Sequence, residues 1–421
     1  MNHNNTYAIN NKNQLLEFTL KHWTEINTYI HQIRAHLPIP FYSSVDIRES
    51  KEKFAPVDHN MFPAGFNNLC RVDINELAAL VKSTVEKYVS DAKVIGIFPE
   101  SHTKNLYYLD HLATLKQIFV DAGFRVYFLS FDLALFDAAN DQQRTRIDLT
   151  SQNGSLIEIY KGKIVDGGIC CMPEKIDLAI CNNDQSNPLP LNWRELKTPL
   201  VPTPLIGWFQ RQKTNHFKHY RNVVLDFCHH FNINPDLLSA RYKEVANVDF
   251  ETKDGIEKIA LAVDELNEEI KKFSLIEDKN FNIFIKASQG TYGMGIMVAK
   301  SGEEVLSMNR KTRNKMDVGK NNIKFTTVLL QEGVETILKY DDMPAEITIY
   351  LVDGHSIGGF MRVNGEKDSL GNLNAKGMVF KKLCMSDIKK DVKDYTEKEA
   401  VYSVIARLAT IASAYEIKEV L

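Results

Sequence analysis

Apolar residues recur at helical spacing near the start of the chain, in residues 12–36, and Pro38 and Pro40 end that predicted helix. From residue 93 to 184, short apolar runs flank one helical pattern. These segments are KVIGIFPE, LYYLDHLATLKQIFVDAG, FRVYFLSF and KIDLAICNND. Strand-length runs around a helix are typical of an α/β sheet with helices on its faces.

The second half of the chain has a different pattern. After the proline-marked connection TPLVPTPLIGWF, helices are predicted near 208–231 and 255–273. From residue 281 strand-like runs follow one another: FNIFIKA, GIMVAK, a short basic helix, IKFTTVLLQEG, AEITIYLVDG and HSIGGFMRV. An amphipathic helix, EKEAVYSVIARLATIASAYEI, is expected last. We therefore expect an α/β (α+β) protein with domains 1–200 and 201–421, the second built on a mixed, mostly antiparallel sheet.

Composition narrows the class of protein. The 421 residues are 44% hydrophobic and 25% charged, as in soluble globular proteins. The net charge of −3 argues against nucleic acid or membrane as the main partner. With no signal-peptide h-region and no run of about 20 apolar residues, a cytoplasmic protein with small-molecule partners is expected. No C-x-x-C pair is present, so the cysteines are interpreted as reduced: Cys70, Cys170, Cys171, Cys181, Cys228 and Cys384.

The segment FNIFIKASQGTYGMG ends an apolar strand with Lys286 and continues into a loop with three glycines. A plain hairpin turn explains the glycines but not the lysine, because a cation at a buried strand end needs an anion. Backbone N–H groups beside glycines bind phosphates well. The spacing matches neither a P-loop nor a dinucleotide fingerprint. A flap over a nucleotide is therefore one hypothesis, and a simple hairpin is the alternative.

Other charged residues end later strands. If these ends meet at one edge, Lys286 and Arg362 would act as catalytic cations on the phosphates, and Glu332 would accept hydrogen bonds from a purine or ribose. Solvated strand ends are the alternative. The predicted nucleotide-binding residues are Lys286, Gln289, Gly290, Thr291, Tyr292, Gly293, Gly295, Gln331 and Glu332.

Two further polar segments have competing interpretations. GEKDSLGNLNAKG holds hard oxygen ligands of the kind that magnesium prefers, or it is an ordinary polar turn. RKTRNK is basic, but without interleaved aromatic residues a solvated helix or a phosphate rim is favoured over nucleic-acid binding.

Several of these motifs together resemble one family. KASQGTYGMGIM, NRKTRNKM, QEGV, the VDG-to-FMRV hairpin and GNLNAKGMVF resemble the proteobacterial glutamate–cysteine ligase family, whose C-terminal half looks like an ATP-grasp domain. VDIRES, APVDHNMFPAGFNNL, PESHTKN and CNNDQS extend the resemblance over nearly the whole chain. It implies ATP-dependent joining of the glutamate γ-carboxylate to the cysteine amine through γ-glutamyl phosphate, the first step of glutathione synthesis.

The resemblance also implies ligand residues. ATP-grasp ligases usually hold magnesium with a terminal E-x-N pair, and none follows Asn374, so the substitute ligands are Glu346, Asp368, Asn372 and Asn374. An amino-acid clamp needs a cation for an α-carboxylate and carboxylates for an α-ammonium. Residues 42–68 supply both, unless they form a structural Ω-loop. The clamp is predicted at Asp46, Arg48, Asp58, Asn60, Asn67 and Asn68.

Two other functions remain open from the sequence. The first is another ATP-grasp carboxylate–amine ligase with a different amino acid as substrate. The second is an ATP-binding module without catalysis, suggested by the missing E-x-N pair.

Overall fold

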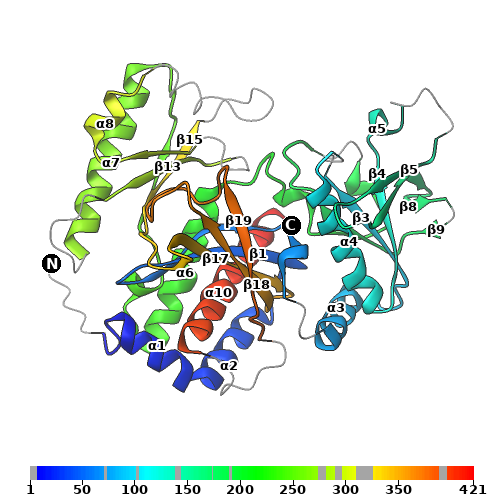
Figure 1. The fold of residues 1–421 in the computed structure, drawn as a ribbon, viewed down its shortest axis with the longest axis horizontal. Coiled ribbons are helices and arrows are strands. Elements are labelled where there is room, and N and C mark those ends of the chain that lie inside the picture. Colours follow the sequence, from blue (N-terminus) through cyan, green and yellow to red (C-terminus); the bar gives the residue numbers. More distant parts are fainter. Residues whose placement is uncertain are drawn as a thin grey trace.

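The chain folds around a central antiparallel sheet with one lobe on either side (Figure 1). The structure, a computed structural model, confirms the predicted mixed α/β class. The described residues are 7–70, 74–100, 104–137, 144–172, 174–188, 192–273, 281–289, 296–309, 326–387 and 396–421.

The central sheet takes its strands from both ends of the chain. Its order is β19 (Met378–Leu383), β18 (His355–Asn364), β17 (Met343–Val352), β1 (Tyr42–Glu49) and β2 (Phe54–Asn60), with the short β16 (Lys339–Tyr340) on β17. β1 pairs with β17, which lies about 300 positions away in the sequence, with Ile47 opposite Ile347. The division at residue 200 stays a prediction, and this sheet contains strands from both sides of it.

Four helices cover one face of the central sheet: α1 (Lys12–Lys21), α2 (Trp23–Arg34), α6 (Lys213–Phe231) and α10 (Glu397–Val420) (Figure 1). The prediction that α10 is amphipathic is wrong, because every residue from Ala400 to Ala414 is buried. Hydroxyl groups of α10 form hydrogen bonds within the helix or with the central sheet. For example, the hydroxyls of Thr410 on α10 and Ser43 on β1 lie 2.9 Å apart. Among the described residues only α10 is long and apolar enough to cross a membrane, and 94% of its apolar window is buried here.

The second sheet lies in the lobe at the right of Figure 1. Its order is β11 (Leu200–Val201), β10 (Leu178–Asn182), β3 (Val94–Pro99), β4 (Arg125–Ser130), β6 (Leu156–Lys161) and β5 (Arg146–Thr150), parallel except for β5. α3 (Ile74–Tyr88) and α4 (Leu106–Asp121) pack on it, and Asn105 caps α4 by accepting from two backbone N–H groups. The lobe also contains α5 (Ala134–Asp137) and the small sheet β7 (Lys163–Val165), β8 (Gly168–Cys171) and β9 (Glu174–Lys175).

The third sheet lies in the opposite lobe. Its order is β12 (Tyr242–Ala246), β15 (Thr327–Glu332), β13 (Ile283–Ala287) and β14 (Ile296–Ala299), all antiparallel. α7 (Lys253–Phe273) and α8 (Gly302–Leu306) cover its apolar face. These strands confirm the predicted succession, whereas the basic helix predicted at 310–315 lies outside the described residues.

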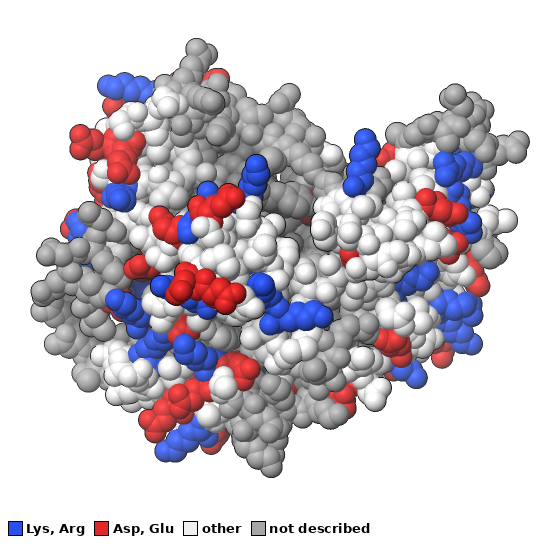
Figure 2. Space-filling view, viewed as in Figure 1, with Lys and Arg blue, Asp and Glu red and all other residues white. Residues whose placement is uncertain are grey.

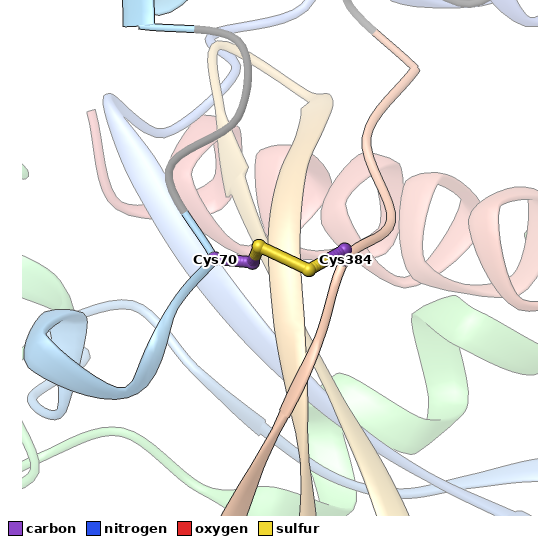
Figure 3. The surroundings of a disulfide bond; sticks show 2 residues. All are labelled: Cys70 and Cys384. Carbon is purple, nitrogen blue, oxygen red and sulfur yellow. A yellow bond between two sulfur atoms is a disulfide. The ribbon is translucent and has the colours of Figure 1, made fainter.

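A disulfide corrects the prediction that all the cysteines are reduced. Cys70 and Cys384 are bonded, with their Cα atoms 5.1 Å apart (Figure 3). Cys70 follows the 3-10 helix η1 (Phe66–Asn68) and Cys384 follows β19, so tertiary folding brings together cysteines 314 positions apart. Spacing in the sequence could not show this pair. The free cysteines are Cys170, Cys171, Cys181 and Cys228.

The disulfide should contribute to stability because it closes a long loop. We expect Cys384→Ser to lower the free energy of unfolding by about 2–4 kcal/mol under oxidising conditions, as measured by urea unfolding. A reducing agent should lower the stability of the parent protein to the level of the variant and leave the variant unchanged. An equal response of both proteins to the reducing agent would contradict this assignment.

Candidate active site

Two connected cavities open between the lobes. The smaller, of about 80 Å³, lies between the third sheet and the central sheet. The larger, of about 390 Å³, lies between the central sheet and the lobe of the parallel sheet. Figure 2 shows a surface notch between the lobes with basic side chains on both rims. Five residues line both cavities and define their junction: Asp46, Asp58, Lys213, Arg362 and Asn374.

Lys286 lies in the smaller cavity because it alternates with the core residues of β13. Its ammonium group donates to the backbone oxygen of Val57 at 2.9 Å and to Oε1 of Gln331 at 2.6 Å. Burial is the main cause that lowers the pKa of Lys286, to about 8, although Asp58 acts in the opposite direction. The amide nitrogen of Gln331 is buried and has no partner among the described residues. A ligand with acceptor atoms would satisfy this nitrogen.

The remaining predicted nucleotide residues are only partly described. Glu332 lines the smaller cavity, where its carboxylate accepts from Lys53 at 2.8 Å and from the backbone N–H of Arg241 at 2.8 Å. Gln289 is half-buried at the end of the described part of the segment. The other predicted residues lie outside the described residues: Gly290, Thr291, Tyr292, Gly293 and Gly295.

Arg48 lies in the smaller cavity and not in the larger one, where Asn60, Asn67 and Asn68 are found. Its Nε donates to Glu346 at 2.8 Å, and its other nitrogens donate to the backbone oxygens of Val334 and Gly371. The sequence predicts Arg48 as part of the amino-acid clamp. Arg48 is two residues beyond Asp46 on the same face of β1, so it lies farther along the strand, against the third sheet. Its predicted role as an α-carboxylate clamp stays untested.

Arg362 lies at the junction of the two cavities. Its Nη1 donates to Asp46 at 2.7 Å and to Glu346 at 2.6 Å, and its Nε has no partner among the described residues although the side chain is buried. Burial raises the pKa of Asp46 more than Arg362 lowers it. Burial would also raise the pKa of Glu346, but the charges of Arg48 and Arg362 lower it. The junction therefore holds a fixed cation with one donor available to a ligand.

Lys213 is a junction residue that the sequence does not predict. It begins α6, its ammonium group lies 2.7 Å from Asp58, and it stacks over the ring of Trp208 at 4.4 Å. Burial would raise the pKa of Asp58, but the charges of Lys213 and Lys286 lower it to about 2. Nothing in the sequence separates Lys213 from an ordinary exposed lysine at a helix start.

The far wall of the larger cavity is built at the carboxyl ends of β3 and β10. Glu100 follows β3, Asp184 follows β10, and Asn182 ends β10 with its side-chain oxygen 2.7 Å from Nε2 of His111. Burial lowers the pKa of His111 to about 4, so this imidazole is neutral at pH 7. Ligands commonly bind at this edge of parallel sheets. The segments around Glu100 and Asp184 contribute to the family resemblance, but the sequence predicts no role for either residue.

The predicted magnesium ligands stay a prediction, and three of the four have hydrogen-bond partners within the protein. Both oxygens of Glu346 accept from arginines. Asp368 lines neither cavity and accepts from the backbone N–H of Leu370, while Asn372 accepts from the backbone N–H of Asn374. Among the described residues, no group of three His, Cys, Asp or Glu side chains could hold a metal.

Comparisons with known proteins identify the class of protein. A family model described as "GshA: Glutamate-cysteine ligase" matches residues 17–417, so the protein is a ligase. The chain belongs to the glutamate–cysteine ligase family. A structure named as a candidate gamma-glutamylcysteine synthetase from Methylobacillus flagellatus KT is 31% identical, with 96% of each chain covered and a TM-score of 0.84.

Other comparisons add little. D-alanyl-alanine synthetase A from Vibrio cholerae O1 biovar eltor str. N16961 is 10% identical over 65% of this chain and 67% of its own. Its TM-score of 0.34 is too low to support an argument about fold. No curated protein matches the sequence.

The pKa of Lys286 predicts a pH dependence. In the free protein Lys286 loses its proton as the pH rises through about 8, so the predicted attraction between Lys286 and ATP phosphates should weaken above that pH. We expect calorimetry to show weaker ATP binding at about pH 9.5 than at about pH 7.

A matched pair of variants isolates this lysine. Lys286→Arg, which stays charged, should remove most of the pH dependence, whereas Lys300→Arg, at an exposed position after β14, should keep it. The same pH dependence in both variants would mean that another group is responsible.

Proposed function

We propose that the protein joins the γ-carboxylate of glutamate to the amino group of cysteine, with conversion of ATP to ADP and phosphate. The proposal rests on one observation above all: the two cavities meet at Arg362, whose side chain lines both. A nucleotide in the smaller cavity and an amino acid in the larger one would place their reacting ends at the same cation. This arrangement suits phosphoryl transfer between two separately bound molecules.

The smaller cavity is proposed to bind ATP. Lys286 and the amide nitrogen of Gln331 would donate to phosphate oxygens, and Glu332 with its neighbouring backbone would accept from the purine or ribose. The resemblance to ATP-grasp proteins supports this placement of the phosphates near Lys286 and of the purine or ribose near Glu332. A nucleotide bound in this way would direct its γ-phosphate toward Arg362 and Lys213.

The larger cavity is proposed to bind the amino acids. In the first step an oxygen of the γ-carboxylate attacks the γ-phosphorus, ADP leaves, and γ-glutamyl phosphate forms. Arg362 and Lys213 would stabilise the negative charge on the transferring group. In the second step the cysteine amine attacks the acyl carbon, and phosphate leaves with the bond electrons. Asn60, Asn67 and Asn68 would hold polar groups of the substrates.

A requirement for magnesium and a cytoplasmic location stay predictions. No step is assigned to magnesium; among the described residues no group of three His, Cys, Asp or Glu side chains could hold a metal. Activity assays with and without the ion test the requirement. The buried position of α10 argues against a membrane anchor there, whereas a disulfide is uncommon in cytoplasmic proteins.

The reaction is tested directly by its product. We expect ATP, magnesium, glutamate and cysteine together to yield γ-glutamylcysteine, identified by mass spectrometry, with one phosphate released per product. With hydroxylamine in place of cysteine, γ-glutamyl hydroxamate should form, because an acyl phosphate reacts with this nucleophile. A panel of other amino acids serves as the control. A faster reaction with a different pair would show a ligase of another specificity.

Lys213 gives a test of the junction. We expect Lys213→Met to lower kcat/KM for both ATP and glutamate by at least about tenfold, equivalent to about 1.4 kcal/mol, because one ammonium group would serve both ligands. Lys218→Met, at an exposed position on the same helix, is the matched control. A loss confined to one of the two substrates would contradict a shared junction.

A further inference from the structure

Arg211 is a buried arginine that lines neither cavity but contacts the elements around their junction. It lies two residues before α6, and only 6% of the residue is exposed. Its Nη1 donates to the backbone oxygen of His59 on β2 at 2.9 Å, and its Nε donates to Glu416 on α10 at 2.9 Å. One side chain therefore ties together β2, the start of α6 and the end of α10.

The planar guanidinium group of Arg211 fits all these partners at once. Its Nε and Nη2 donate to the two oxygens of Glu416, and Nη2 also lies 3.1 Å from Nδ1 of His59. Because a guanidinium can only donate, Nδ1 of His59 is the acceptor. Burial, above all, holds the pKa of His59 well below its usual value, so this imidazole is neutral. Burial would raise the pKa of Glu416, but Arg211 and His216 lower it to about 2, so the ion pair with Arg211 is complete at neutral pH.

Both members of the Lys213–Asp58 pair lie next to this anchor. Asp58 directly precedes His59 on β2, and the side chains of neighbouring strand residues point to opposite faces. Holding His59 from the helix side therefore directs Asp58 into the junction. Lys213 follows Arg211 by two residues, at the first position of α6. The Arg211 Cζ and the Lys213 Nζ both lie over the ring of Trp208, at 4.8 and 4.4 Å from its centroid.

The start of α6 is also held from the lobe of the third sheet. The backbone N–H of Lys213 donates to the backbone oxygen of Ser288 at 2.7 Å, and the hydroxyls of Thr214 and Ser288 lie 3.0 Å apart. Ser288 follows β13, the strand that carries Lys286. Arg211 and Ser288 thus fix Lys213 from two sides, and the position of its ammonium group depends on both.

We infer that Arg211 is a positioning residue, which holds the ammonium of Lys213 and the carboxylate of Asp58 at the junction without contacting a substrate. This inference rests on the proposed function, in which Lys213 stabilises the transferring phosphoryl group. A reacting group has to be held within about 0.5 Å of its productive position, so a small displacement of Lys213 costs rate even in a folded protein.

A purely structural ion pair is the alternative. Arg211 and Glu416 would then serve only the stability of the fold, where removing one partner of a buried pair is costly. A substitution of Arg211 would in that case lower activity by the same factor whether or not Lys213 is present. The two roles therefore differ in how the effects of two substitutions combine.

A double-mutant cycle on kcat/KM for ATP separates the two roles. Arg211→Lys keeps a positive charge opposite Glu416 but loses the planar fork that also reaches His59. We expect it to lower kcat/KM by at least about tenfold in the parent protein. In Lys213→Met protein it should lower kcat/KM by less than about twofold, because the group that it positions is absent. Arg221→Lys, at an exposed position on α6, is the matched control and should change kcat/KM in neither background.

Glu416→Gln serves if Arg211→Lys does not fold, because it leaves Arg211 in place and removes the charge that orients it. The same dependence on Lys213 is expected. Two outcomes would overturn the inference: an unchanged kcat/KM in the folded variant, or an equal loss with and without Lys213. If the parent protein makes no γ-glutamylcysteine, the proposed function fails, whereas the same cycle measured on the Kd for ATP by calorimetry still tests Arg211.

Discussion

A buried network of two arginines and two carboxylates holds the centre of this structure together. Arg362 on β18 contacts Asp46 on β1 and Glu346 on β17, and Glu346 also accepts from Arg48 on β1. Removing these charges from water is costly, and their mutual contacts offset that cost only while all the partners are in place. The network therefore couples the register of three strands to the position of the cation between the cavities.

The two cavities follow from the order of strands in the central sheet. Because β1 and β2 enter this sheet beside β17, their polar face is directed at the third sheet on one side and at the parallel sheet on the other. The helices on the opposite face, α10 above all, form an apolar base that fixes the sheet. The arrangement gives two cavities with a shared junction, as the proposed ligation requires.

The predicted elements were correct where local pattern is strong. The apolar runs at β13, β14, β15, β17 and β18 are visible in the sequence, and so are the cations Lys286 on β13 and Arg362 on β18. β1 and β2 escaped prediction because their cavity face carries Asp46, Arg48 and Asp58, which removes the usual contrast between buried and exposed positions. α10 appeared amphipathic because its hydroxyl residues read as polar, whereas inside the protein they are hydrogen-bonded and buried.

The sequence by itself determined the mixed α/β class, the helices and strands with a strong local pattern, and the resemblance to glutamate–cysteine ligases. These properties depend on residue periodicity within short segments and on motifs of about ten residues, which need no long-range contact to be recognised. The tertiary structure alone decided that Arg48 lies with Lys286, that Lys213 and Glu100 line the cavities, and that Cys70 pairs with Cys384. Each of these depends on which distant strands pair, and that choice is made by burial of the whole core.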